Sequence, residues 1–184
     1  MIPDQEIRIA AFEWLNKAVE CHDDLLGRSF LATGFQFHDT RVPLLSPQGI
    51  FKPRICELPL SITTTTGGPY DDSFDPDGLL SYRYRRDDPD HRDNRGLRRA
   101  MLESVPLVYF HSVIPGRYLA VYPVYIAGDE PDALTFTVAA DDVSVAVEGS
   151  DYVTEDPMPR RQYITTCVRQ RLHQRGFHER VLHA

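Results

Sequence analysis

Residues 67–85, GGPYDDSFDPDGLLSYRYR, form the most informative stretch of the chain. The glycines at its start permit positive φ angles or a close approach of the backbone, and an acidic segment with a proline follows them. The alternation over residues 80–84 is typical of a half-buried strand. The stretch therefore predicts a strand end, a loop and a returning strand. Tyr70 and Asp72 would lie on the loop, opposite Tyr82 on the returning strand.

Two aromatic rings and a carboxylate placed in this way can hold one planar ligand. The rings stack on its faces, and the carboxylate accepts a hydrogen bond from an amine on its edge. Cytosine carries such an exocyclic amine. We therefore predict a pocket for a cytosine-like base, with Asp72 as the contact to the amine and Asp71 as the second candidate.

The same residues resemble the SRA (SET- and RING-associated) domains, which have a PUA-like fold and bind modified cytosine flipped out of duplex DNA. That family combines Gly-Gly-Tyr, two acids, an acid–Gly turn, and an apolar pair followed by Ser/Thr-Tyr. The matching residues here are Gly67, Gly68, Tyr70, Asp71, Asp72, Asp75, Gly78, Leu79, Leu80, Ser81 and Tyr82. Two features depart from the family pattern. The spacing from Tyr70 to the second acid is one residue shorter, and Arg83 replaces a small hydroxyl residue.

The resemblance implies an α+β fold, a PUA-like/SRA-like curved β-barrel with flanking N- and C-terminal helices. It implies double-stranded DNA as the partner, with 5-methylcytosine or 5-hydroxymethylcytosine as the flipped base. The expected modified-base pocket consists of Tyr70, Asp71, Asp72, Ser81, Tyr82 and Arg83.

The net charge of −7 over 184 residues argues against a protein that holds nucleic acid by bulk charge. Contacts with DNA phosphates must therefore come from local basic residues. Residues 49–54, GIFKPR, resemble the family segment that approaches the DNA, although a solvated loop is an equal alternative. The expected contacts to the DNA backbone are Lys52, Arg54, Arg85, Arg86, Arg92, Arg95, Arg169 and Arg171.

The remaining pattern predicts secondary structure around this centre. Apolar residues three and four positions apart predict a helix over residues 3–26. Apolar and β-branched runs predict strands over residues 58–66, 106–113, 118–126, 135–138 and 143–147. A short helix is expected to begin with Asp93 or Asn94 as its N-cap. Residues 83–99 alternate Arg and Asp, which predicts either a hydrated loop or a loop whose arginine fills the space left by the flipped base.

We expect three segments: an N-terminal helix packed on the domain (1–30), the SRA-like barrel (31–156) and a basic helical linker (157–184). Residues 169–182 resemble the segment that precedes an HNH nuclease domain in restriction endonucleases. This resemblance implies the specificity module of a modification-dependent, type IV HNH endonuclease. The nuclease and its divalent metal would then lie outside this chain, and a homodimer would form through the full-length protein.

No nucleophile elbow, phosphate-binding glycine loop or metal-ligand spacing occurs in the sequence, so we expect a non-catalytic chain without a cofactor. The scattered Cys21, Cys56 and Cys167 favour a reducing cytoplasm, and no apolar run suggests a membrane segment. Two other functions fit the sequence. One is a PUA-like RNA-binding module that uses the same aromatic residues, and the other is a protein-interaction domain whose acidic loop is only solvated.

Overall fold

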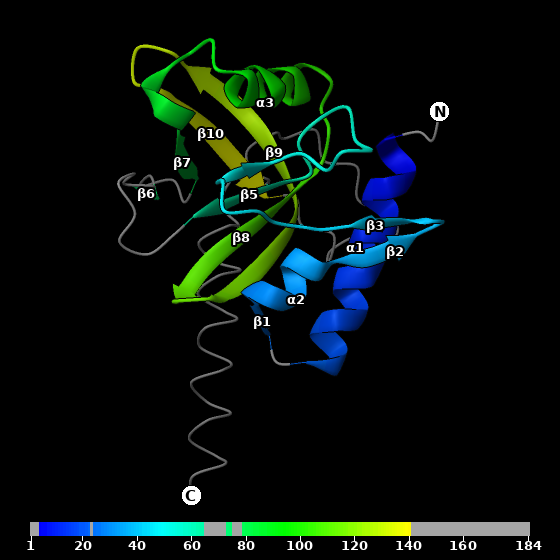
Figure 1. The fold of residues 1–184 in the computed structure, drawn as a ribbon. Coiled ribbons are helices and arrows are strands. Elements are labelled where there is room, and N and C mark those ends of the chain that lie inside the picture. Colours follow the sequence, from blue (N-terminus) through cyan, green and yellow to red (C-terminus); the bar gives the residue numbers. More distant parts are fainter. Residues whose placement is uncertain (1–3, 23, 65–72, 75–78, 141–184) are drawn as a thin grey trace, which may run out of the picture.

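The computed structural model describes residues 4–22, 24–64, 73–74 and 79–140. This part of the chain is α+β, with a curled mixed sheet in the form of a half-barrel and helices packed against it (Figure 1). The helices are α1 (Asp4–Cys21), α2 (Arg28–Thr33) and α3 (Arg92–Leu102), and a 3-10 turn, η1, spans Arg85–Asp87. The strands are β1 (Leu25–Gly27), β2 (Phe35–Phe37), β3 (Thr40–Val42), β4 (Ile50–Phe51), β5 (Ser61–Thr64), β6 (Ser73–Phe74), β7 (Leu80–Arg83), β8 (Leu107–Ile114), β9 (Arg117–Glu130) and β10 (Thr135–Ala140).

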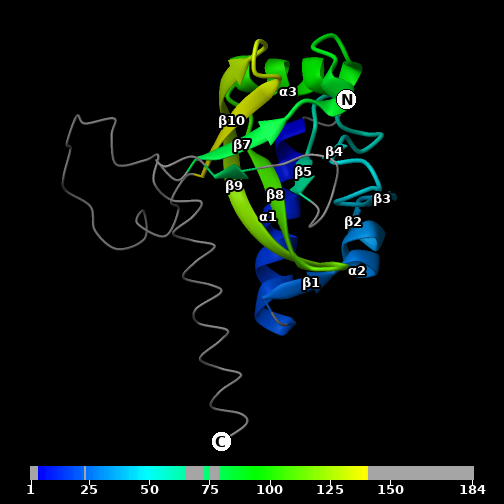
Figure 2. The same cartoon turned by 90° about the vertical axis from the view of Figure 1, so that its left-hand side faces the viewer.

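The main sheet has the strand order β4-β5-β8-β9-β10-β7-β6, with β1 also paired to β9. β5 and β8 run parallel, whereas the neighbouring pairs are antiparallel. The long strands β8 and β9 bend strongly, and Figure 2 shows the resulting curl. β8, β9 and β10 separate β5 from β7 in the sheet, yet the Tyr82 hydroxyl on β7 lies 3.4 Å from the Thr63 carbonyl oxygen on β5. The curl therefore brings the two flanks of the sheet together.

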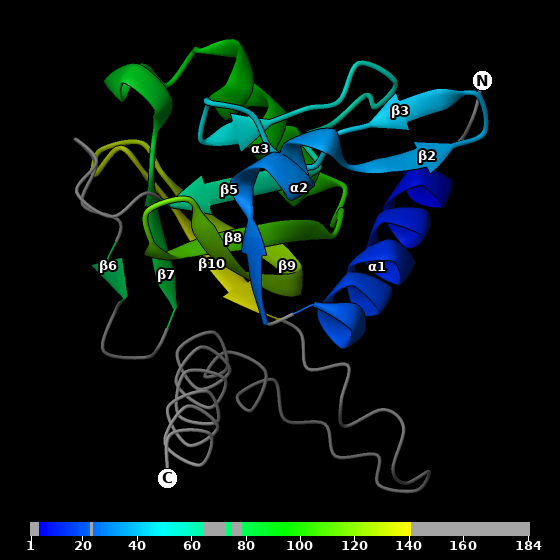
Figure 3. The same ribbon diagram turned by 60° about the horizontal axis from the view of Figure 1, so that its bottom comes forward.

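The sheet has a hydrophobic core on each face, because side chains alternate along its strands. Val108 and Phe110 of β8 pack with Leu15 and the rest of the apolar side of α1. Tyr109, between them, belongs to the other core, which also contains Leu97 of α3. The small β2–β3 ribbon lies beside α1 (Figure 3). The two cores hold α1 and α3 against opposite faces of the sheet.

The predicted first helix is confirmed for Asp4–Cys21 and wrong for its last residues. Leu25 and Leu26 instead begin β1, where Leu25 pairs with Leu119 of β9. An extended segment there satisfies backbone groups at the sheet and also buries both leucines. The segment 1–30 therefore contributes a strand as well as a helix.

The predicted strands around residues 106–113, 118–126 and 135–138 are confirmed as β8, β9 and β10. The strand expected over residues 58–66 is shorter, since β5 spans Ser61–Thr64. Residues 65–66, the strand expected at 143–147 and the linker at 157–184 lie outside the described residues.

The expected short helix is present as α3, but the prediction of its N-cap is wrong. His91 is the N-cap, and its Nδ1 accepts a hydrogen bond of 3.2 Å from the Asp93 backbone N–H. Asn94 is fully buried and holds the preceding turn instead. The hydrated loop predicted over residues 83–99 is also wrong in part, because η1 and the first two turns of α3 occupy much of it.

Candidate functional site

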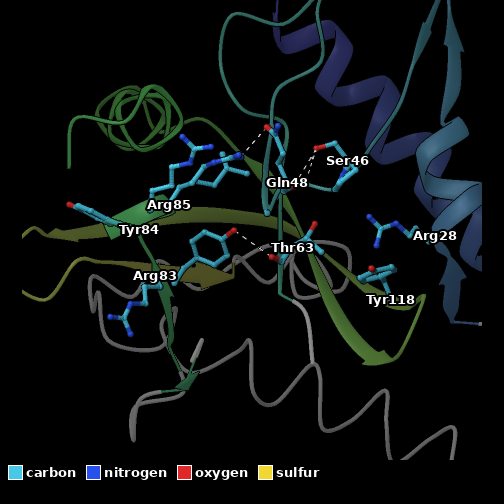
Figure 4. Close-up of a pocket in the computed structure, with 13 residues that line it drawn as sticks. Arg28, Ser46, Gln48, Thr63, Arg83, Tyr84, Arg85 and Tyr118 are labelled. Atoms are coloured by element: carbon cyan, nitrogen blue, oxygen red, sulfur yellow. Dashed lines mark hydrogen bonds between the residues drawn. The ribbon is translucent and has the colours of Figure 1, made fainter. Parts of the chain in front are cut away.

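A cavity of about 340 Å³ lies where β5, β7 and the segment before β4 meet (Figure 4). In that view Arg28 and Tyr118 lie at one end, Arg85 lies toward the other, and Thr63 lies between them. Among the described residues, the lining consists of Arg28, Ser46, Pro47, Gln48, Gly49, Ile50, Thr63, Tyr82, Tyr84, Tyr118 and the arginines 83, 85 and 86. Residues distant in sequence therefore share one concavity.

Close backbone packing at Gly49 brings the strands together at the cavity. The Thr63 N–H donates to the Gly49 carbonyl oxygen at 2.8 Å. A Cβ atom on Gly49 would lie 2.7 Å from the Tyr82 hydroxyl and 3.3 Å from the Thr63 carbonyl oxygen. A side chain at this position would therefore displace the Tyr82 hydroxyl and press on the β5 backbone, so glycine is favoured here.

The hydroxyl of Thr63 is buried without a hydrogen bond. Thr63 is 8% exposed, and within the described part of the chain its Oγ1 has no partner. Its neighbour Thr64 is equally buried, but the Thr64 hydroxyl shares a 3.0 Å hydrogen bond with the Tyr109 hydroxyl. Tyr109 in turn shares a 2.9 Å hydrogen bond with His111 Nδ1, and burial lowers the pKa of His111. The two threonines of β5 therefore differ in whether their hydroxyls are satisfied.

Within the part of the chain that the structure describes, the charged side chains that line the cavity are arginines, namely Arg28, Arg83, Arg85 and Arg86. The Arg85 guanidinium donates to Gln48 Oε1 at 2.9 Å and pairs with Asp93 at 2.9 Å. Arg83 forms a 3.3 Å ion pair with Asp87, in which both side chains are exposed. The cavity thus presents positive charge although the chain as a whole is acidic.

The turn η1, which carries Arg85 and Arg86, has a strained backbone that hydrogen bonds hold in place. Arg86 and Asp87 have φ angles of 59° and 49°, a left-handed conformation that costs a non-glycine residue about 1–3 kcal/mol. Asn94 Oδ1 accepts from the Arg85 N–H at 2.9 Å. Its amide donates to the carbonyl oxygens of Arg85 at 3.1 Å and Asp88 at 2.6 Å. Asn94 therefore fixes the backbone at the rim of the cavity.

A polar cluster of Tyr84, Arg98 and Asp129 joins the residue after β7 to α3 and β9. The Tyr84 hydroxyl donates to Asp129, and Arg98 donates to both Asp129 and, at 3.2 Å, the Tyr84 hydroxyl. Burial, followed by the hydrogen bond to Asp129, raises the pKa of Tyr84. Because these three side chains hydrogen-bond to one another, the cluster connects α3 to the sheet and stabilises the fold.

The structure places part of the predicted base pocket. Tyr82 and Arg83 line the cavity, whereas Ser81 pairs with Thr137 of β10 and is not among the lining residues. Tyr82 is 4% exposed and its ring belongs to the core. Tyr70, Asp71 and Asp72 lie outside the described residues. Stacking of a base between the two tyrosines stays a prediction.

Of the residues predicted to contact the DNA backbone, some line the cavity, some lie outside its lining and some are not described. Arg85 and Arg86 line the cavity. The exposed Lys52, Arg54, Arg92 and Arg95 lie outside its lining, and the Lys52 ammonium donates to the Cys56 carbonyl oxygen at 2.9 Å. Arg169 and Arg171 lie outside the described residues.

Sequence reasoning missed several lining residues: Arg28, Ser46, Gln48, Thr63, Tyr84 and Tyr118. The signal available for one of them was the run of threonines at 63–66, which places hydroxyl groups on a strand directly before the Gly-Gly motif. Arg28 and Tyr118 carried no local signal, because their place at the cavity depends on how the sheet curls.

The described residues contain no group of three or more His, Cys, Asp or Glu side chains arranged to hold a metal ion. No helix in the same part of the chain is both long and apolar enough to cross a membrane. Comparisons of the chain with protein-family models, with curated proteins and with solved structures return no match.

Proposed function

We propose that this chain is a DNA-binding module with a PUA-like, SRA-like fold, which recognises modified cytosine by base flipping and directs an HNH endonuclease to modified DNA. The observation that carries the proposal is the position of the cavity. Thr63 of β5, which precedes the Gly-Gly motif in the sequence, and Tyr82 of β7, which follows the motif and β6, both line it.

The segment that carries Tyr70 and Asp72 begins after Thr64 of β5, and the chain then reaches β6 at Ser73 and β7 at Leu80. β6 pairs with β7, and Thr64 is the neighbour of Thr63 in the cavity lining. A base that entered the cavity would meet Tyr82 and Thr63. Tyr70 and Asp72 lie between these two residues in the sequence. The spatial arrangement supports the pocket that the sequence predicts.

The size of the cavity supports a small planar ligand. Its volume of about 340 Å³ falls at the lower end of the range of roughly 300–1,000 Å³ that small-molecule pockets occupy. Hydroxyl, amide and guanidinium groups in the lining supply the hydrogen bonds that fix the orientation of such a ligand.

The distribution of charge supports DNA as the source of that ligand. Local arginines at a concave site can position phosphates even when the whole chain is acidic. Because Asn94 of α3 holds the backbone of Arg85, this part of the rim is preorganised.

The decisive experiment compares three ligands for the full 184-residue chain by fluorescence anisotropy. They are a duplex with one central 5-methylcytosine or 5-hydroxymethylcytosine, the identical unmodified duplex, and a single-stranded RNA of the same sequence. We expect the modified duplex to bind about tenfold tighter or more, since one extra methyl group in a fitted apolar pocket is worth roughly 1–3 kcal/mol. Equal affinity for the two duplexes would overturn the proposal. Tighter binding of RNA would favour an RNA-binding module, and no binding to any ligand would favour a protein-interaction domain.

A further inference from the structure

A second concavity, the α1 groove, has a volume of about 420 Å³ and lies at the N-terminal end of α1, the end nearer α3 (Figure 1). Its apolar lining comes from Ile9 and Phe12 of α1, from Leu58, and from Val105 and Pro106 after α3. Ile9 is 49% exposed, although isoleucine is among the residue types most often buried. The α1 groove shares no lining residue with the arginine-lined cavity.

Carboxylates surround this apolar lining. Among the described residues, five of them line the α1 groove or lie within one helical turn of Ile9: Asp4, Glu6, Glu13, Glu57 and Glu103. Two arginines lie beside them. Arg8 is buried and pairs with Asp4 at 2.8 Å, and Arg99 is shared between Glu103 at 2.6 Å and Glu57 at 3.6 Å. The α1 groove therefore carries a net negative charge.

This charge determines the kind of occupant that fits. The carboxylates repel the phosphates of nucleic acid. They also repel a second copy of the same face, because a symmetric dimer brings identical patches together. A helix with an apolar stripe and basic residues around it is complementary to the α1 groove.

Residues 160–175 of the same chain have this pattern. Ile164, Val168 and Leu172 recur every four residues and share one face in a helix. The segment has no acidic residue, and five arginines surround the apolar ones: Arg160, Arg161, Arg169, Arg171 and Arg175. In both hydrophobicity and charge, the sequence of this segment complements the α1 groove.

The last described residue lies close enough for this segment to reach the α1 groove. Ala140 pairs with Val124 of β9, which in turn pairs with Leu107 of β8. Two strand spacings of about 4.8 Å each therefore separate Ala140 from Leu107, which follows Pro106 of the groove. Residues 141–159 span up to about 60 Å when fully extended, which is several times the distance required.

We propose that residues 160–175 dock in the α1 groove as an amphipathic helix, with their apolar stripe on its apolar lining and their arginines paired with its carboxylates. Residues 160–175 lie outside the described part of the chain, and the groove that receives them lies within it. The contact is separate from the proposed function. It assigns Arg169 and Arg171, which the sequence predicts as contacts to DNA, to carboxylates of the same chain.

The first test measures the proximity of the segment to the α1 groove with a nitroxide label on Cys167. In a helix this residue faces away from the apolar stripe, because adjacent residues do not share a face. Cys21→Ser removes an exposed thiol, and burial raises the pKa of Cys56 to about 12, which leaves that thiol unreactive. In NMR spectra of the full chain, we expect the label to broaden the methyl signals of Ile9. The signals of Ile114, which is equally exposed at the far end of β8, should stay sharp.

Substitutions in the segment provide a matched pair. Val168→Asp places a charge in the apolar stripe and should abolish the broadening at Ile9. Val181→Asp makes the same change outside residues 160–175 and should leave the broadening unchanged.

Substitutions in the α1 groove provide a second pair. The double change Glu57→Lys and Glu103→Lys reverses two exposed charges and should abolish the broadening at Ile9, with little effect on stability. Glu20→Lys reverses an exposed charge at the other end of α1 and should not affect it. Raising the salt concentration from about 0.1 M to about 1 M shortens the Debye length from about 10 Å to about 3 Å and should also weaken the broadening.

A mixture of two preparations separates contact within one chain from contact between copies. Isotope-labelled chains without nitroxide are mixed with nitroxide-labelled chains of natural isotopic abundance. Broadening at Ile9 in this mixture would place the segment on a second copy and overturn the proposal. Absence of broadening in the doubly labelled chain, or broadening that survives Val168→Asp, would also overturn it. A preference for the modified duplex would stand in each of these cases, because the cavity is separate from the α1 groove.

Discussion

Two polar regions near β7 differ in whether their buried polar groups are hydrogen-bonded. In the cluster of Tyr84, Arg98 and Asp129, the three side chains hydrogen-bond to one another. In the cavity, Thr63 keeps a buried hydroxyl without a partner in the described part of the chain. Close by, the rim is built on the strained backbone of Arg86. The first arrangement stabilises the fold, whereas the second lowers its stability. We therefore expect substitutions in the cluster to act on stability and those in the cavity to act on binding.

The largest effect on stability should come from Asp129→Asn in the cluster. The substitution leaves the largely buried Arg98 without its carboxylate, which we expect to lower the free energy of unfolding by about 2–3 kcal/mol. Urea denaturation measures this loss. Glu103→Gln breaks the exposed Arg99–Glu103 pair and serves as the control, which should hardly change stability. Equal effects of the two substitutions would contradict the structural role of the cluster.

Asn94→Ala should affect both stability and binding, because Asn94 connects the fold to the rim of the cavity. The loss of three hydrogen bonds to the turn should lower the free energy of unfolding by about 2 kcal/mol. The affinity for modified DNA should also fall, since Arg85 and Arg86 lose their fixed backbone. Asn16→Ala removes one exposed hydrogen bond to Tyr122 and should leave the affinity intact. An Asn94→Ala chain that binds DNA normally would show that the turn does not position the arginines.

Gly49→Ala tests the close packing at the cavity wall. The added methyl group would lie 2.7 Å from the Tyr82 hydroxyl, so we expect a loss of about 1–3 kcal/mol in stability and weaker binding of the ligand. Tyr82→Phe removes the atom in conflict. The double substitution should therefore recover part of the stability in urea denaturation, and additive losses would contradict this geometry.

The smallest effect on stability concerns the other face of β5. There a series of hydrogen bonds connects Thr64, Tyr109 and His111. Burial lowers the pKa of His111, so the unfolded chain binds the proton more readily than the folded chain. His111 should therefore contribute its full stability above the unfolded pKa of about 6.5 and lose it as the pH falls below that value. His111→Gln should flatten the stability profile between about pH 7 and pH 5. Identical profiles for the two chains would contradict this assignment.

Sequence patterns predicted the elements whose signals are local. The spacing of Ile7, Ala11 and Leu15 indicated α1, and the apolar runs on either side of Gly116 indicated the β8–β9 hairpin. The alternation at residues 80–84 likewise indicated β7. In each case the side chains that form the pattern are neighbours within one helix or one strand.

The cavity was predictable only in part, because the curl of the sheet assembles it. Tyr82 and Arg83 came from the motif, but Thr63 and Arg28 reach the same space from β5 and α2. The N-cap of α3 was missed for a related reason. Asn94 is a good cap by type, yet its side chain binds the backbone of Arg85, nine residues earlier. Contacts of this range leave no periodic trace in a sequence.

In the proposed function, the chain flips a modified cytosine into the arginine-lined cavity. The most direct measurement places 2-aminopurine next to the modified cytosine in a duplex and follows its fluorescence as the full chain is added. Extrusion of the neighbouring base unstacks the probe, so we predict a rise in fluorescence with the modified duplex and little change with the unmodified one. Selective binding of the modified duplex without any rise in fluorescence would contradict base flipping, and an equal rise with both duplexes would contradict recognition of the modification.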